Sequence, residues 1–132
     1  MTDIFVLYVS HDADLVSRLV HALRKLWHVT WAPDIPHGDW EEYVRSEIPR
    51  SRCVVAVLPR KGGIGRTDIL RDEMHHAKDN SIPLIPFRLG SEPMPMGFGS
   101  LARVEASEWD GSVHHAAYCE LEAKLKTLLG EP

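Results

Sequence analysis

Apolar runs alternate with amphipathic stretches along the chain, and this alternation predicts strands that are separated by helices. The runs at 4–9 and 53–58 are almost entirely apolar and rich in β-branched residues, which is typical of strands covered on both faces. Shorter runs at 29–31, 82–87 and 101–104 predict three more strands. The run at 82–87 contains two prolines, which favour an edge position or an irregular ladder because proline donates no backbone hydrogen bond.

Apolar residues recur at helical spacing in the stretches between and after these runs. Asp12 and Asp14 open the first stretch, Asp39 and Glu42 form an acidic variant of the capping box before the second, and Pro49 marks its end. Strands that alternate with helices require right-handed crossovers, so the predicted fold is α/β, a doubly wound parallel sheet of about five strands with helices on both faces. The predicted helices lie at 12–26, 39–48, 67–77 and 116–129.

Three loops follow the carboxyl ends of the predicted strands, which is where ligands of such sheets bind. They begin at Ser10, Ala32 and Pro59. The second loop holds two prolines and a glycine, so we expect it to be stiff and exposed. The third is rich in glycine, but it lacks the spacing and the Lys-Ser/Thr ending of a phosphate-binding P-loop. An ordinary flexible loop is therefore expected there.

Length and charge narrow the function classes. The 132 residues are expected to form a single domain, which is either a whole protein or the N-terminal domain of a longer one with a sensor or effector domain. The formal net charge of −4 gives no reason to expect nucleic acid or an anionic membrane as a partner. No apolar run approaches the ~20 residues of a membrane helix, and no signal peptide opens the chain. We therefore expect a soluble protein of the cytoplasm.

The two cysteines and eight histidines are candidates for special chemistry. Cys53 lies in an apolar run and Cys119 in an amphipathic stretch, so both are predicted to be buried thiols rather than a disulfide. His75 and His76 are adjacent on a predicted helix and diverge by about 100°, and the chain shows no zinc-type spacing of cysteine and histidine. No metal site is predicted.

Glu73 is the most informative single residue. At helical spacing Leu70, Met74 and Ala77 form an apolar stripe, and Glu73 falls within the same arc, whereas its neighbour Asp72 points away. A carboxylate on the buried side of a helix needs partners or shifts its pKa. Glu73 is therefore either a structural anchor that braces a nearby loop or a functional group.

In their order and spacing, these segments resemble the Toll/interleukin-1 receptor, or TIR, domain family across most of the chain. Residues 3–12 are similar to the family's first strand, which typically runs Asp-x-Phe-(Ile/Val)-Ser-Tyr-Ser and then an acidic residue. Residues 31–40 resemble the second strand and the following "BB" loop, and 54–58 the third strand. Residues 71–77 resemble the helix with the pattern Trp-x-x-x-Glu, and 82–87 the fourth strand. The resemblance implies a flavodoxin-like fold.

The resemblance also implies an activity. TIR enzymes, among them many bacterial immune proteins, cleave the nicotinamide–ribose bond of NAD, and Glu73 matches the glutamate that they require. Nicotinamide leaves as a neutral base without a general acid, so what the reaction needs is a carboxylate that stabilises an oxocarbenium-like transition state. We therefore expect an NAD glycohydrolase or ADP-ribose cyclase in antiphage-type immune signalling, with NAD as substrate and no cofactor.

Non-catalytic adaptors form the second functional class of this family, and this alternative stays open. In that case the domain is a TIR–TIR assembly module and Glu73 is structural. For the enzyme as well as the adaptor, the resemblance implies a homo-oligomer with contacts through residues 34–39. A receiver-like phosphoacceptor domain is a third and weaker alternative, because no acceptor aspartate ends the third strand.

Further substrate contacts follow from position within the resemblance. Ile69 stands where the family has a tryptophan four residues before the glutamate, so an aromatic wall of the pocket is missing or has moved. Trp40 follows the BB-loop glycine and is able to supply a stacking face. The expected substrate-binding residues are Tyr8, Ser10, Trp31, Asp34, Trp40 and Ile69.

Overall fold

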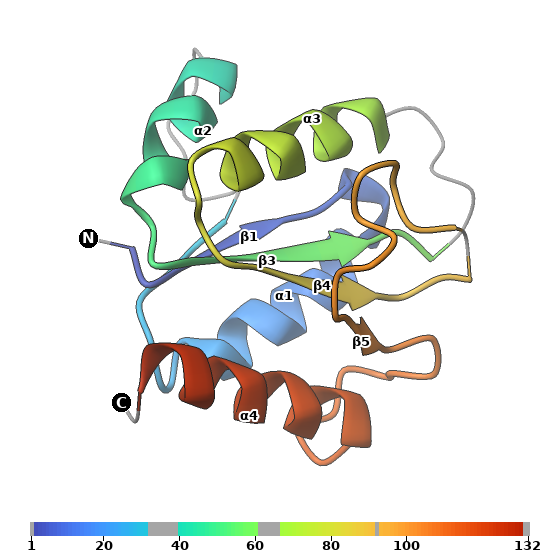
Figure 1. Ribbon diagram of the computed structural model, residues 1–132. Helices are drawn as coiled ribbons and strands as arrows, with labels where there is room; N and C mark the ends of the chain where they lie inside the picture. Colours follow the sequence, from blue (N-terminus) through green and yellow to red (C-terminus); the bar gives the residue numbers. More distant parts are fainter. Residues whose placement is uncertain (1, 32–39, 61–66, 92, 131–132) are drawn as a thin grey trace.

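A five-stranded parallel sheet lies at the centre of the computed structural model, which describes residues 2–31, 40–60, 67–91 and 93–130 (Figure 1). The strand order within these ranges is β2-β1-β3-β4-β5, with every neighbouring pair parallel. This arrangement confirms the predicted α/β fold. The strands are β1 (Ile4–Leu7), β2 (Val29–Thr30), β3 (Cys53–Leu58), β4 (Leu84–Arg88) and β5 (Val104–Glu105).

Helices cover both faces of the sheet. Figure 1 shows α2 and α3 on one face and α1 and α4 on the other. Short 3₁₀ turns, η1 and η3, precede α1 and follow α2. The bounds are η1 (Ser10–Asp12), α1 (Ala13–Leu23), α2 (Trp40–Glu47), η3 (Ile48–Arg50), α3 (Thr67–Asp79) and α4 (Ala116–Leu129).

Two apolar cores result, one on each side of the sheet. Side chains alternate along β1, so Ile4 and Val6 join the core under α1 and α4, whereas Phe5 and Leu7 join the core under α2 and α3. All four are at most 2% exposed. Burial on both faces explains why β1 and β3 are continuous apolar runs rather than alternating ones. No helix in the described part of the chain is long and apolar enough to span a membrane.

Several element ends differ from the predicted ones. β1 ends at Leu7 rather than at residue 9, and α1 ends at Leu23, where the chain turns so that Trp27 donates its N–H to the Leu23 carbonyl. The α2 helix stops at Glu47, because Pro49 lies in the following 3₁₀ turn. β5 occupies Val104–Glu105 instead of 101–104.

The prolines of β4 favoured an edge position or an irregular ladder, and the edge position is wrong, because β4 pairs with β3 on one side and β5 on the other. The N–H of Leu89 donates to a carbonyl of β3, so odd-numbered residues of β4 point their N–H groups toward β3. Pro86 therefore faces the β5 side, where pairing begins only at Phe87 opposite Val104. The missing N–H of Pro86 falls just outside the β4–β5 ladder.

The two cysteines differ in exposure, which corrects the expectation that both are buried. Both are free thiols, but Cys119 is exposed on α4 and only Cys53, in β3, is buried. Burial raises the pKa of the Cys53 thiol to about 12. Thiols react as thiolates, so Cys53 is protected by its inaccessibility and by its pKa.

We therefore predict that a thiol reagent such as DTNB modifies one cysteine of the native protein at pH 8 and both after unfolding in guanidinium. The Cys119→Ser variant should show no reaction until it is unfolded. Rapid modification of native Cys119→Ser would contradict the burial of Cys53. The measurement is the absorbance of the released thiolate against time.

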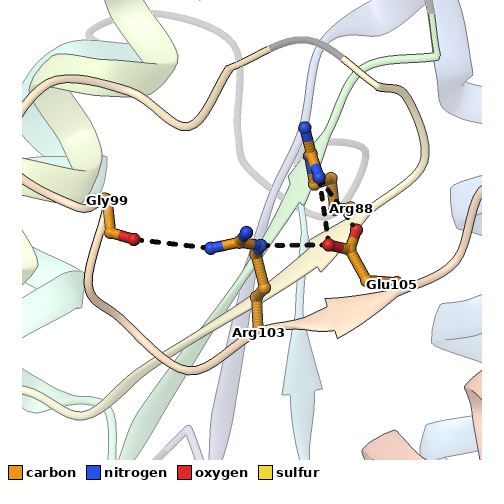
Figure 2. Close-up of polar contacts among 4 residues, drawn as sticks. All are labelled: Arg88, Gly99, Arg103 and Glu105. Atoms are coloured by element: carbon orange, nitrogen blue, oxygen red, sulfur yellow. Dashed lines mark hydrogen bonds and ion pairs between the residues drawn. The ribbon is translucent and has the colours of Figure 1, made fainter.

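A carboxylate shared by two arginines joins β4 to β5 and to the chain before it (Figure 2). Arg88 Nη1 lies 3.2 and 3.0 Å from the two Glu105 carboxylate oxygens, and Arg103 Nε lies 3.1 Å from Oε2. Desolvation alone would raise the pKa of Glu105, but the hydrogen bonds and charges of Arg103 and Arg88 outweigh it and lower this pKa. Since Arg88 and Glu105 are paired in the β4–β5 register, the cluster reinforces a ladder of only two residue pairs.

We predict that Glu105→Gln lowers the melting temperature by a few degrees at pH 7. Because folding lowers the pKa of Glu105, its contribution is present above the unfolded-state pKa of about 4.3 and is lost as the pH falls through the lower folded-state value. The difference between variant and native protein should thus shrink as the pH is lowered and the Glu105 carboxylate is protonated. Glu108→Gln, an exposed neighbour, is the control. A difference that is unchanged at low pH would argue against this ion-pair cluster as the cause.

Candidate functional site

A groove of about 510 Å³ lies between α2 and α3. Its volume is within the range of small-molecule sites. Helix α2 and the turn after it form one wall, and α3 forms the other. The lining residues are Val44, Arg45 and Ile48 on the first wall and Ile69, Asp72, Glu73, His75, His76 and Asp79 on the second.

Glu73 reaches the groove because of its place on α3. Leu70, Met74 and Ala77 are at most 2% exposed and pack toward the sheet, as the stripe predicted. Glu73 is half-buried at the margin of this stripe and faces the groove. Asp72 was expected to point away from this stripe, and it is exposed. It nevertheless lines the groove, because the groove extends around α3 beyond the position of Glu73.

His76 joins the two walls of the groove. Its Nε2 lies 2.7 Å from the backbone carbonyl oxygen of Arg45. A carbonyl oxygen only accepts hydrogen bonds, so Nε2 carries the proton and donates it to this bond. The side-chain amide of Asn80 in turn donates to the His76 carbonyl at 2.8 Å, near the end of α3. The spacing between α2 and α3 is therefore set by a short polar contact as well as by packing.

His75 lines the same groove as His76 and also holds a second segment against α3. The His75 Nε2 atom donates to the Met96 carbonyl at 3.2 Å, and its ring lies 4.7 Å from that of Phe98. Gly97 has a φ of +95°, and a Cβ there would stand 2.9 Å from His75 Cε1. Lys78 Nζ also donates to the Gly97 carbonyl at 3.2 Å. These contacts fix α3 between α2 and the chain after β4.

The groove combines apolar walls with acidic side chains. Val44 and Ile48 are buried, and Ile69 is half-buried. Among the described residues, three carboxylates, those of Asp72, Glu73 and Asp79, lie along the α3 wall, and one guanidinium, that of Arg45, lies on the α2 wall. An arrangement of this kind favours a ligand that is positively charged where it meets α3 and apolar enough to lie against aliphatic side chains.

The other predicted substrate residues are not all in this groove. Ile69 lines it together with Glu73. Tyr8 and Trp31 contact each other, with ring centroids 5.7 Å apart, but they pack against the core under α1 and α4, on the opposite face of the sheet. Ser10 and Trp40 are placed only by backbone, in η1 and at the start of α2. Asp34 and the rest of the loop 34–39 lie outside the described residues.

An ion pair at the carboxyl edge of the sheet was missed by the sequence analysis. Asp12 has no exposed side-chain surface, and its Oδ1 accepts a hydrogen bond of 2.7 Å from Arg60 Nε. Its Oδ2 is buried without a hydrogen-bond partner among the described residues. Asp12 stands at the N-terminus of α1, as the sequence predicts, but its side chain makes no capping hydrogen bond to the helix. The only signal for the pair was that both residues follow strands whose carboxyl ends meet at one edge.

Comparison with known proteins places this geometry in a family. The family model for the TIR domain matches residues 4–121. The structure is similar to the TIR domain of the Toll-related receptor TRR-2 from Hydra magnipapillata, with a TM-score of 0.75, 14% identity and coverage of 96% of this chain and 99% of that chain. It is also similar to the TIR domains of the activated Roq1 resistosome that directly recognises the pathogen effector XopQ, with a TM-score of 0.59, 16% identity and coverage of 95% and 73%.

A search of curated proteins gave no match. The sequence identities to the two solved structures are low, so these similarities establish the fold and nothing further. The family model, in contrast, extends from the first residue of β1 into α4 and spans most of the sequence. The chain therefore belongs to the TIR domain family.

Proposed function

We propose that this TIR domain cleaves the bond between nicotinamide and ribose in NAD, with Glu73 as the catalytic carboxylate. The observation that carries the proposal is the position of Glu73, which is half-buried in a groove with aliphatic walls and two further carboxylates nearby. The nicotinamide ring of NAD is a planar cation. A groove that is both acidic and apolar is complementary to that end of the substrate.

The chemistry requires little more than a positioned negative charge. The bond between the ribose C1′ and the ring nitrogen breaks, and its electron pair neutralises the nicotinamide ring. Positive charge develops on the ribose, where a carboxylate held nearby stabilises the oxocarbenium-like transition state. Water then bonds to C1′ and releases a proton, which gives ADP-ribose. If a group of the substrate itself attacks instead, the product is a cyclic isomer.

Ile69 gives this groove a different wall from the one that the family pattern implies. It is half-buried one helical turn before Glu73, and side chains four residues apart lie on the same face of a helix. An aliphatic side chain there offers apolar contact to the ring but no aromatic stacking. In our proposal Ile69 packs against the nicotinamide and excludes water from Glu73.

Assembly is the second candidate function, and it is compatible with the first. One of the structurally similar chains is the TIR part of an activated resistosome. By analogy, copies of this chain would associate through residues 34–39, which directly precede α2 in the sequence. If catalysis depends on that contact, activity rises with protein concentration. If the domain is only an assembly module, it associates without cleaving NAD.

The direct test is nicotinamide release from NAD at low and high protein concentration. We predict that Glu73→Gln lowers kcat by about 10²-fold or more, because the amide has a similar shape but no charge to stabilise the transition state. Glu120→Gln is the matched control: it makes the same change at an exposed position of α4, on the other face of the sheet, and should leave kcat within about twofold. Chromatography of the second product separates the hydrolase from the cyclase.

Two results would contradict the proposal. Cleavage that is unchanged in Glu73→Gln would place the catalytic group elsewhere. Absence of cleavage at every concentration, with self-association intact, would favour the assembly module alone. Circular dichroism of both variants establishes that a loss of activity is not a loss of folding.

A further inference from the structure

We propose that the guanidinium of Arg45 binds the diphosphate of the dinucleotide. The carboxylates of the α3 wall would then face the cationic ring, and Arg45 on the α2 wall would face the phosphates. This inference rests on the proposed function and specifies how the substrate is oriented in the groove. It assigns a binding role to a residue of α2 that no motif in the sequence singles out.

The charges of the groove impose the orientation. NAD carries one positive ring and two negative phosphates, and the carboxylates of Asp72, Glu73 and Asp79 are all on the α3 wall. Phosphates laid along that wall would be repelled by each of them, whereas the ring would be attracted. Of the groove residues that the structure describes, Arg45 is the one with a guanidinium, and it lies on the opposite wall. The favourable arrangement therefore places the ring toward α3 and the diphosphate toward α2.

Arg45 is available for an anion. It is exposed, and it makes no ion pair with any residue in the described ranges of the chain. Other arginines of the molecule are already engaged: Arg60 is bound to Asp12, and Arg88 and Arg103 share Glu105. A guanidinium has a planar set of donors that matches two phosphate oxygens at once.

The backbone of Arg45 is also held in place. Its carbonyl oxygen accepts the 2.7 Å hydrogen bond from His76, which ties this turn of α2 to α3. Arg45 and Ile48 are three residues apart, so they lie on the same side of the helical turn, and Ile48 is fully buried at the groove. The side chain of Arg45 thus starts from a fixed point on the rim. Because this part of the backbone is already fixed, Arg45 loses less conformational entropy when it binds an anion.

The test compares substrates with and without the diphosphate. We expect Arg45→Gln to raise the KM for NAD by about tenfold or more and to leave kcat within about twofold, because the reacting bond is untouched. The same variant should cleave nicotinamide riboside, which has no phosphate, as well as the native protein does. Arg45→Lys should recover part of the loss. Arg50→Gln, an exposed arginine in η3 outside the groove, is the control and should leave both substrates unchanged.

A binding measurement makes the result independent of turnover. Calorimetry of ADP binding to the Glu73→Gln protein should show a dissociation constant that rises about tenfold when Arg45→Gln is added and that also rises with salt. Equal losses for NAD and nicotinamide riboside, or unchanged ADP binding, would overturn the assignment of Arg45. If the native protein cleaves neither substrate, the proposed function fails, and ADP binding still decides the role of Arg45.

Discussion

Burial of the central strands on both faces is the constraint on which the rest of the structure depends. β1 and β3 expose almost no side-chain surface, so each face of the sheet needs its own layer of helices. One layer must be formed by α2 and α3, because the right-handed crossovers from β2 to β3 and from β3 to β4 lie on the same side. Two helices laid side by side on one face leave a groove between them. The placement of Glu73 follows from this layering.

Helix α3 packs against the sheet with one side, and in the proposed mechanism a neighbouring side carries the catalytic carboxylate. Met74 and Ala77 are fully buried in the core, so the helix has little freedom to rotate. His76 and His75 add polar contacts to α2 and to the segment after β4. Glu73 directly precedes Met74, so in the proposed mechanism its carboxylate is held in place by the same packing. Electrostatic stabilisation of a transition state depends on such groups being fixed before the substrate arrives.

The sequence predicted the fold and the face of α3 because both depend on hydrophobic periodicity. Leu70, Met74 and Ala77 are spaced so that only one side of the helix can meet the sheet, and all three belong to the core on that face. The end of α1 and the start of β5 were predicted less well, since they depend on individual hydrogen bonds. The internal position of β4 was missed because the cost of Pro86 depends on which side its missing N–H faces.

The candidate site was predictable only in part, and for a similar reason. Glu73 and Ile69 share a helix, so their common orientation follows from their spacing. Whether Tyr8 and Trp31 lie on the same side of the sheet as Glu73 depends on strand alternation, and the structure places them against the other core. Arg45 and the buried Asp12–Arg60 pair depend on contacts between distant segments. No local pattern carries that information.

The location of the substrate is the central claim, and NMR measures it most directly. NAD should be titrated into ¹⁵N-labelled Glu73→Gln protein and the backbone amide shifts recorded. Our account predicts that the shifts cluster on the facing sides of α2 and α3, around Arg45, Ile69 and Glu73. Shifts that cluster instead around Tyr8 and Trp31, with the α2–α3 groove unaffected, would contradict it.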